Sequence, residues 1–205
     1  MISFNCLRKR QYANPLNLAV AWIMLLLFLF IYPSPTPGQQ PDRKLHNLLK
    51  QAAREISSFG DPFDAEVWLT DMSGRMEPFI KNPEQRITLL KKIHQEARRN
   101  QLPPELVLAV IQTESAFDRF AVSSAGAQGL MQVMPFWKNE IGHPRDNLTV
   151  TETNLRYGCQ ILGDYLKKEK GNLTRALARY NGSIGQYWYP ERVYSNLEKY
   201  WTTPQ

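Results

Sequence analysis

The chain has 205 residues, of which 25 are Lys or Arg and 19 are Asp or Glu, so its formal net charge is +6. This length suits one domain with a short appendage, and 43% apolar and 11% aromatic residues can build a core, which excludes wholesale disorder. The presence of only two Cys excludes a disulfide framework and a Cys-rich zinc module.

An apolar run covers residues 16–32 and follows a basic cluster at Arg8, Lys9 and Arg10. The run is near the lower limit for a membrane span and slightly long for the core of a signal peptide. Because a basic flank marks the cytoplasmic side, we expect residues 1–38 to be a signal peptide or a membrane anchor. A buried core helix is the alternative.

The Pro-rich stretch that extends to about residue 41 is typical of a stiff linker. The remaining chain would then be exported to the periplasm, either soluble after cleavage or anchored to the inner membrane. Without residues 1–38, 22 basic residues face 19 acidic ones, so half of the net charge belongs to the leader. The exported part would hold one free thiol, Cys159, in the role of a small buried apolar residue.

Apolar residues recur at steps of three and four through most of the exported part, which indicates helices. Asn82 and Asn172 are candidate helix caps, and Pro83 and Pro104 suit first helical turns. No strict alternation exceeds about five residues, so the fold class is predicted to be mainly α. The expected helices cover residues 45–59, 63–80, 83–101, 104–115, 151–170, 173–180 and 190–200.

Glu114 stands at the end of a helix that is apolar on nearly every side. Residues 106–111 contain no polar member, and Glu114 follows Val110 by four positions, so its side chain points toward the same apolar side. Poor solvation and the partial negative charge of a helix C-terminus both raise the pKa of a carboxyl group. A general acid needs such a pKa near neutral pH. A solvated residue at a helix end is the other interpretation.

A loop rich in small residues follows this helix. Ser123, Gly126 and Gly129 would let the backbone approach a ligand closely, and Gln132 supplies an amide group that suits sugar hydroxyls.

Seven aromatic residues fall between positions 180 and 201. Aromatic faces with polar tips suit sugar recognition, although most aromatic residues simply belong to a core. Among them Tyr180 is the site candidate, because the chain turns directly after it at residues 181–183. We expect Tyr200 and Trp201 in the core or in an interface.

Three short motifs stand in order along the chain. Residues 114–115 read ES, residues 126–132 read GAQGLMQ, and residues 176–181 read ALARYN. In type, order and spacing they resemble the SLT-type lytic transglycosylases, bacterial enzymes with a goose-type-lysozyme-like fold that cleave peptidoglycan. The match covers roughly residues 94–193, about half of the chain. The family commonly continues Y-N-A-G-P-G, whereas residues 180–185 read YNGSIG, which changes the expected shape of this loop.

The resemblance implies a lysozyme-like catalytic domain at residues 91–205, with residues 42–90 as a helical extension packed on it. It also implies that Glu114 acts first as an acid and then as a base. The substrate-binding residues implied by the resemblance are Ser123, Met131, Gln132, Tyr180 and Asn181.

The implied reaction cleaves the β-1,4 bond between N-acetylmuramic acid and N-acetylglucosamine. Ordinary glycosidases use two carboxylates, whereas the motif region here offers one convincing carboxylate. The muramic acid 6-hydroxyl would therefore act as the nucleophile and give a 1,6-anhydro product. No cofactor or metal is expected, because His46, His94 and His143 are far apart and no cluster has the spacing of metal ligands.

The expected partner is the peptidoglycan glycan strand, bound by a monomer, with attachment to the inner membrane if residues 1–38 are retained. Three alternatives remain open. A lysozyme-like muramidase would hydrolyse the same bond, and a non-catalytic module would only bind the wall. The third, a nucleic-acid binder, would need a basic face, and we expect no nucleic acid because the exported part is only mildly basic.

Overall fold

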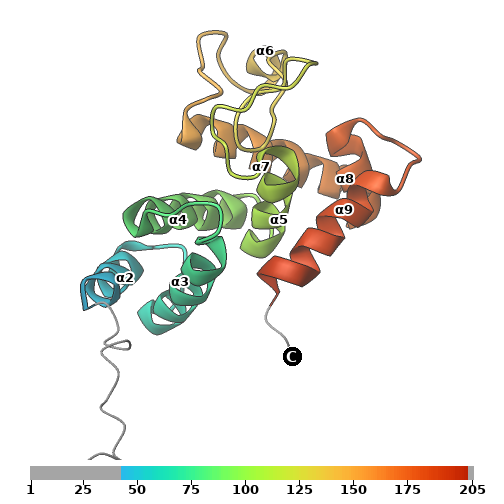
Figure 1. The fold of residues 1–205 in the computed structure, drawn as a ribbon. Helices are drawn as coiled ribbons and strands as arrows, with labels where there is room; N and C mark the ends of the chain where they lie inside the picture. The colour runs from blue at the N-terminus through green and yellow to red at the C-terminus, as the bar shows by residue number, and fades with distance from the viewer. Residues whose placement is uncertain (1–42, 203–205) are drawn as a thin grey trace, which may run out of the picture. The chain divides into compact units, whose positions relative to one another are not determined.

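The computed structural model describes residues 43–202, in which helices pack against one another (Figure 1). No helix in this range is long and apolar enough to cross a membrane, and the predicted leader and linker, residues 1–41, lie outside it. The fold class is mainly α, as predicted, with isolated antiparallel bridges from Gln128 to Val122 and Val133 as the only extended pairing described. The elements are α2 (Arg43–Glu55), α3 (Pro62–Met76), α4 (Pro83–Arg99), α5 (Pro104–Ser115), α6 (Trp137–Ile141), α7 (Thr151–Lys168), α8 (Leu173–Asn181), α9 (Trp188–Asn196) and the π-helix η1 (Leu197–Trp201).

Two helices begin where the sequence predicted caps. The side chain of Asn82 accepts a hydrogen bond from the backbone N–H of Gln85, and Asn172 accepts one from that of Arg175, both at 3.0 Å. Each bond satisfies a backbone donor that the first turn of a helix leaves unpaired. The two cap predictions are therefore confirmed.

The ends of α2 and α3 differ from the sequence prediction. Helix α2 ends at Glu55 and α3 at Met76, several residues earlier than expected. Phe59 instead lies in the turn after α2, where its ring stacks on His94 with 3.7 Å between centroids. The apolar periodicity thus continues into the turn because Phe59 is used for packing there.

The last helix begins at Trp188, two residues before the predicted start at Pro190. Proline is tolerated anywhere in a first turn, because its missing N–H would have no helical partner there. The correction places Tyr189 in the first turn of α9. The short helix α6 was not predicted, and the end of the last predicted helix forms the π-helix η1 rather than a continuation of α9.

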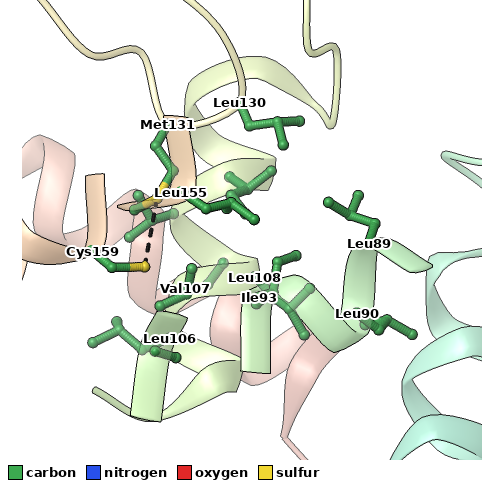
Figure 2. Packing of buried hydrophobic residues seen from close by; sticks show 14 of the residues in the cluster. Leu89, Leu90, Ile93, Leu106, Val107, Leu108, Leu130, Met131, Leu155 and Cys159 are labelled. Atoms are coloured by element: carbon green, nitrogen blue, oxygen red, sulfur yellow. Dashed lines mark hydrogen bonds between the residues drawn. The ribbon is translucent and has the colours of Figure 1, made fainter. Parts of the chain in front are cut away.

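Helix α5 lies between α4 and α9 and packs against both and against η1 (Figure 1). All six residues from Leu106 to Ile111 are at most 2% exposed, which confirms the predicted burial on nearly every side. Figure 2 shows the adjoining core, in which the fully buried Cys159 places its Sγ 3.9 Å from Sδ of Met131. Burial raises the pKa of the Cys159 thiol, so it behaves as the expected apolar residue.

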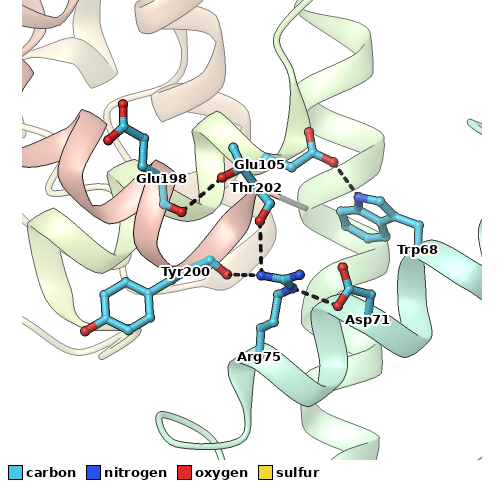
Figure 3. A network of polar contacts seen from close by, with 7 residues as sticks. All are labelled: Trp68, Asp71, Arg75, Glu105, Glu198, Tyr200 and Thr202. Carbon is cyan, nitrogen blue, oxygen red and sulfur yellow. Dashed lines mark hydrogen bonds and ion pairs between the residues drawn. The ribbon is translucent and has the colours of Figure 1, made fainter. Parts of the chain in front are cut away.

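The N-terminal helices hold the C-terminal end of the described chain (Figure 3). The guanidinium of Arg75 in α3 donates to the backbone carbonyls of Tyr200 and Thr202 at 3.1 and 3.2 Å, and to the carboxylate of Asp71 at 2.7 Å. Residues 91–205 were predicted as the catalytic domain, with residues 42–90 packed on it. Helix α4 runs across residue 91 without a break. The domain boundary stays a prediction.

Replacing Arg86 with Met should lower the free energy of unfolding by about 3 kcal/mol. The buried guanidinium donates to Ser73 Oγ at 3.1 Å and to the carbonyls of Ile80 and Lys81, both at 2.9 Å. Its loss would leave Ser73 Oγ, which is buried, and the two part-buried carbonyls without this donor. Urea denaturation measures the change, and Arg54→Met, at an exposed position, is the matched control. Equal midpoints for the two variants would contradict the prediction.

Candidate active site

Glu114 lies in the last turn of α5, half-buried, with one carboxyl oxygen directed at α9. The hydroxyl of Tyr189 donates to Glu114 Oε1 at 2.6 Å. Burial raises the pKa of the Glu114 carboxyl to about 7, although the hydrogen bond from Tyr189 and the charge of Arg192 oppose the rise. A carboxyl group with this pKa can both give and take a proton near neutral pH.

The whole last turn of α5 is fastened to α9 and η1. Trp201 Nε1 donates to Gln112 Oε1 at 2.7 Å, and Asn196 Nδ2 donates to Thr113 Oγ1 at 2.9 Å. Together with the hydrogen bond from Tyr189 to Glu114, three consecutive residues of α5 each form a hydrogen bond with one residue of α9 or η1. This fixes the direction of the Glu114 side chain.

The loop between α5 and α6 is attached to the same turn. Ser115 Oγ donates to the carbonyl of Leu130 at 2.8 Å, and the hydroxyl of Tyr180 donates to the carbonyl of Met131 at 2.6 Å. Burial first, and the negative charge of Glu114 second, raise the pKa of Tyr180 well above its usual value. Tyr180 therefore stays protonated and keeps its donor role.

Asn154, a buried residue in the first turn of α7, holds the loop from its other side. Its Oδ1 accepts from the backbone N–H of Met131, and its Nδ2 donates to the carbonyls of Gln128 and Leu148, all at 2.8 Å. A Cβ atom on Gly129, whose φ is +75°, would lie 2.5 Å from Asn154 Nδ2. This glycine is thus required for packing against Asn154, and the close approach of a ligand that the sequence suggested stays a prediction.

The side chains of Ser123 and Gln132 shape the loop from within. Ser123 Oγ accepts from the N–H of Ala127 at 3.1 Å. Gln132 Nε2 donates to the carbonyls of Ala121 and Gly129 at 3.1 and 2.9 Å. Both side chains are half-buried, and these polar groups are engaged with backbone of the loop.

The structure brings together Glu114, Met131 and Tyr180 from three separate segments. Ser123 and Gln132 lie in the same loop as Met131. Asn181 is exposed at the last position of α8, and no hydrogen bond among the described residues connects its side chain to this group.

Sequence reasoning missed two contributors, Tyr189 and Asn154. Tyr189 was one of several aromatic residues near the C-terminus, and nothing local distinguished it. Asn154 carried a signal in retrospect, because it is a polar residue on the buried face of α7, next to Leu155. A buried amide on a helix face needs partners, so it indicates a hydrogen-bonded loop nearby.

A search of residues 43–202 finds no group of three His, Cys, Asp or Glu side chains that could hold a metal ion.

Comparison with known families assigns the chain. The sequence model of the transglycosylase SLT domain family matches residues 91–201, more than half of the chain. The chain belongs to this family. The resemblance inferred from the three motifs is thus confirmed, and the matched segment contains Glu114, Tyr180 and Tyr189.

Two related proteins each match 47% of this chain. A transglycosylase of Enterobacteria phage PRD1 is 34% identical over 103 residues, which are 47% of this chain and 38% of that protein. A membrane-bound lytic murein transglycosylase C of Yersinia pestis is 32% identical over 112 residues, 47% of this chain and 31% of that protein. The chain thus spans about a third of the length of these relatives.

Among solved structures, an inactive mutant of the lytic transglycosylase Slt from Pseudomonas aeruginosa aligns with a TM-score of 0.43 and 22% identity. The alignment covers 70% of this chain and 30% of that one.

Replacing Glu114 with Gln should stabilise the protein above pH 7 by about 3 kcal/mol. The folded protein raises the pKa of this carboxyl from 4.5 to about 7, so it binds more protons than the unfolded chain between these values. Stability of the wild type therefore falls as the pH rises from 4.5 to 7, whereas the amide does not titrate. Thermal unfolding from pH 4 to 9 measures the difference in stability between the variant and the wild type, which should vanish below pH 4.5. A stability difference that does not depend on pH would contradict the assigned pKa.

Proposed function

We propose that the protein is a peptidoglycan lytic transglycosylase that cleaves the β-1,4 bond between N-acetylmuramic acid and N-acetylglucosamine. The observation that carries the proposal is the Glu114 carboxyl, whose pKa burial raises to about 7 and whose orientation Tyr189 fixes. Membership of the SLT family and relatives named as transglycosylases support it.

In the first step, protonated Glu114 gives its proton to the glycosidic oxygen, and the bond from C1 to that oxygen breaks. The leaving sugar departs with its 4-hydroxyl restored, and positive charge develops at C1. In the second step, the Glu114 carboxylate takes the proton of the muramic acid 6-hydroxyl as that oxygen bonds to C1. The acid is regenerated, and the product is a 1,6-anhydro sugar.

A single carboxylate suffices for this cycle. In the described part of the chain, the side chains that shift the pKa of Glu114 are a tyrosine and an arginine, and no second carboxylate is among them. A glycosidase with two carboxylates places them on opposite sides of the scissile bond. The relatives named transglycosylase favour the lyase over the lysozyme-like hydrolase, which remains the second candidate.

The sugar-binding roles implied for Ser123, Met131, Gln132, Tyr180 and Asn181 belong to this proposal. Tyr180 and Met131 would form the floor of the site beside Glu114, because the hydroxyl of one binds the carbonyl of the other. Ser123 and Gln132 would act by shaping the loop.

Aromatic residues next to Tyr189 extend the proposed site. Tyr187 and Trp188 directly precede it, and they are 65% and 52% exposed. Exposed aromatic faces of this kind can stack on sugar rings. Both would therefore contact substrate on the α9 side.

We infer an envelope location, where peptidoglycan lies. The relatives named membrane-bound transglycosylase support it, and so does the apolar run 16–32 with its basic flank. Residues 42–90 would be a helical extension of the catalytic domain.

Replacing Glu114 with Gln should reduce turnover of purified peptidoglycan at least ~1000-fold, because the amide can neither give nor take the proton. Mass spectrometry of the products decides the reaction type, since the anhydro sugar is one water lighter than the reducing sugar of a hydrolase. Glu105→Gln in the same helix is the matched control and should retain activity. A Glu114→Gln protein with a large share of wild-type turnover would overturn the proposal.

Replacing Tyr189 with Phe should move the alkaline limb of the pH profile of kcat/KM upward by up to about one pH unit. The tyrosine bond lowers the pKa of Glu114, so its loss lets the pKa rise. We also expect kcat to fall by roughly 10-fold, since the carboxyl is held less firmly. Tyr194→Phe is the matched control, because it removes a hydroxyl of α9 that bonds to Thr174 at 2.9 Å instead. A shift of the limb to lower pH would contradict the role of Tyr189.

A further inference from the structure

A pocket of about 270 Å³ lies between α8 and the loop that connects α8 to α9. One wall comes from the end of α7 and one face of α8, and the other from residues 184–187. Polar and charged groups dominate the α7–α8 wall, while exposed apolar groups dominate the loop. The lining residues that matter here are Glu169, Thr174, Arg175, Arg179, Ile184 and Tyr187.

The pocket carries an excess of positive charge. Arg175 and Arg179 both bind the carboxylate of Glu169, Arg175 through Nε at 2.6 Å, and the Glu169 side chain is 5% exposed. Two cations thus face one buried anion, which leaves one positive charge. The Arg175 side chain is 68% exposed at the pocket, so it can meet a ligand from solution.

The surroundings add to this positive field. Lys168 and Lys170 flank Glu169 in the sequence, and both are exposed. Between residues 164 and 179, five basic residues stand against two acidic ones. Such a local excess attracts anionic ligands and raises their concentration near the pocket.

Two lining residues of the pocket are close in the sequence to residues of the proposed catalytic site. Arg179 directly precedes Tyr180, which binds the carbonyl of Met131. Tyr187 comes two residues before Tyr189, which binds Glu114. The pocket and the proposed site are thus built on the same two segments, α8 and the start of α9.

A buried polar group without a partner directly precedes the loop wall in the sequence, although it does not line the pocket. Ser183 is 7% exposed, and its Oγ has no hydrogen-bond partner in the described part of the chain. It directly precedes the lining residue Ile184, at the point where the sequence departs from the pattern of the family. A buried hydroxyl of this kind is costly unless a ligand or water completes it.

We propose that the pocket binds a carboxylate of the acidic peptide that muramic acid carries, on the same strand whose glycosidic bond lies at Glu114. The proposal rests on the proposed function, and it names a further part of that substrate. Guanidinium groups are suited to carboxylates because their planar donors match the two oxygens. The volume is below the about 300 Å³ at which pockets for whole small molecules begin, so it fits a group of amino-acid size.

The test compares two substrates, glycan strands with their peptides and strands from which an amidase has removed them. We expect the wild type to prefer the peptide-bearing strands, measured as the ratio of kcat/KM values. Arg175→Gln should reduce this preference by about 3- to 10-fold, and Arg175→Lys should restore part of it. Lys168→Gln removes a positive charge next to Glu169 in the sequence, at a residue that does not line the pocket, so it should keep the wild-type preference.

The outcomes separate this proposal from the proposed function. Anhydro products from both substrates, with an Arg175→Gln preference equal to that of the wild type, would overturn the pocket assignment and leave the lyase intact. A loss of substrate preference in Arg175→Gln that Lys168→Gln reproduces would also overturn the pocket assignment, because the preference would then depend on the general positive charge of this surface.

A binding measurement works even without turnover. A free acidic peptide, compared with its amidated form, is titrated into the Glu114→Gln protein, and NMR shifts of the Arg179 and Gln186 amides are followed. Shifts with the acidic form alone, lost in the Glu114→Gln/Arg175→Gln protein, support the site. Equal shifts with both forms, or none, overturn it.

Discussion

A neutral carboxyl group can exist at the end of α5 because apolar side chains, rather than water, surround the helix that carries it. Leu106 to Ile111 are buried, and burial dominates the pKa of Glu114. The hydroxyl of Tyr189 then orients the group without ionising itself, since burial and the nearby carboxyl raise the pKa of the tyrosine as well. The apolar core and the proton chemistry thus have one physical origin, the low polarity around α5.

The geometry of this group comes from segments that are distant in the sequence. Glu114 is on α5 and Tyr189 on α9, and Tyr180 on α8 binds the loop that Asn154 holds from α7. Each of these contacts is a directed hydrogen bond with at least one buried partner, and such bonds are costly to leave unmade. They hold Glu114 and the loop in place, which the proposed role of Glu114 requires.

Local physics explains what the sequence could predict. Helix caps such as Asn82, the buried stretch of α5 and the inward direction of Glu114 follow from spacing within a few residues. The partners of Glu114 could not be predicted, because the pairing with Tyr189 spans 75 positions and depends on how α9 packs on α5. Pro190 misplaced the start of α9 because proline suits every position of a first turn. The role of Gly129 was hidden because its neighbour Asn154 is far along the chain.

The contacts of Arg75 have a consequence for modularity. Its guanidinium joins α3 to the carbonyls at the end of η1, while Trp201 of η1 is bonded to the last turn of α5. The segment shared with the family, residues 91–201, therefore begins inside α4. Its last residues are bonded to Arg75, which lies outside the segment. We therefore expect the family segment of this protein to depend on α3 for its stability. An excised copy or a chimaera joined at residue 91 would divide α4 and release the far end of the helix pair that orients Glu114.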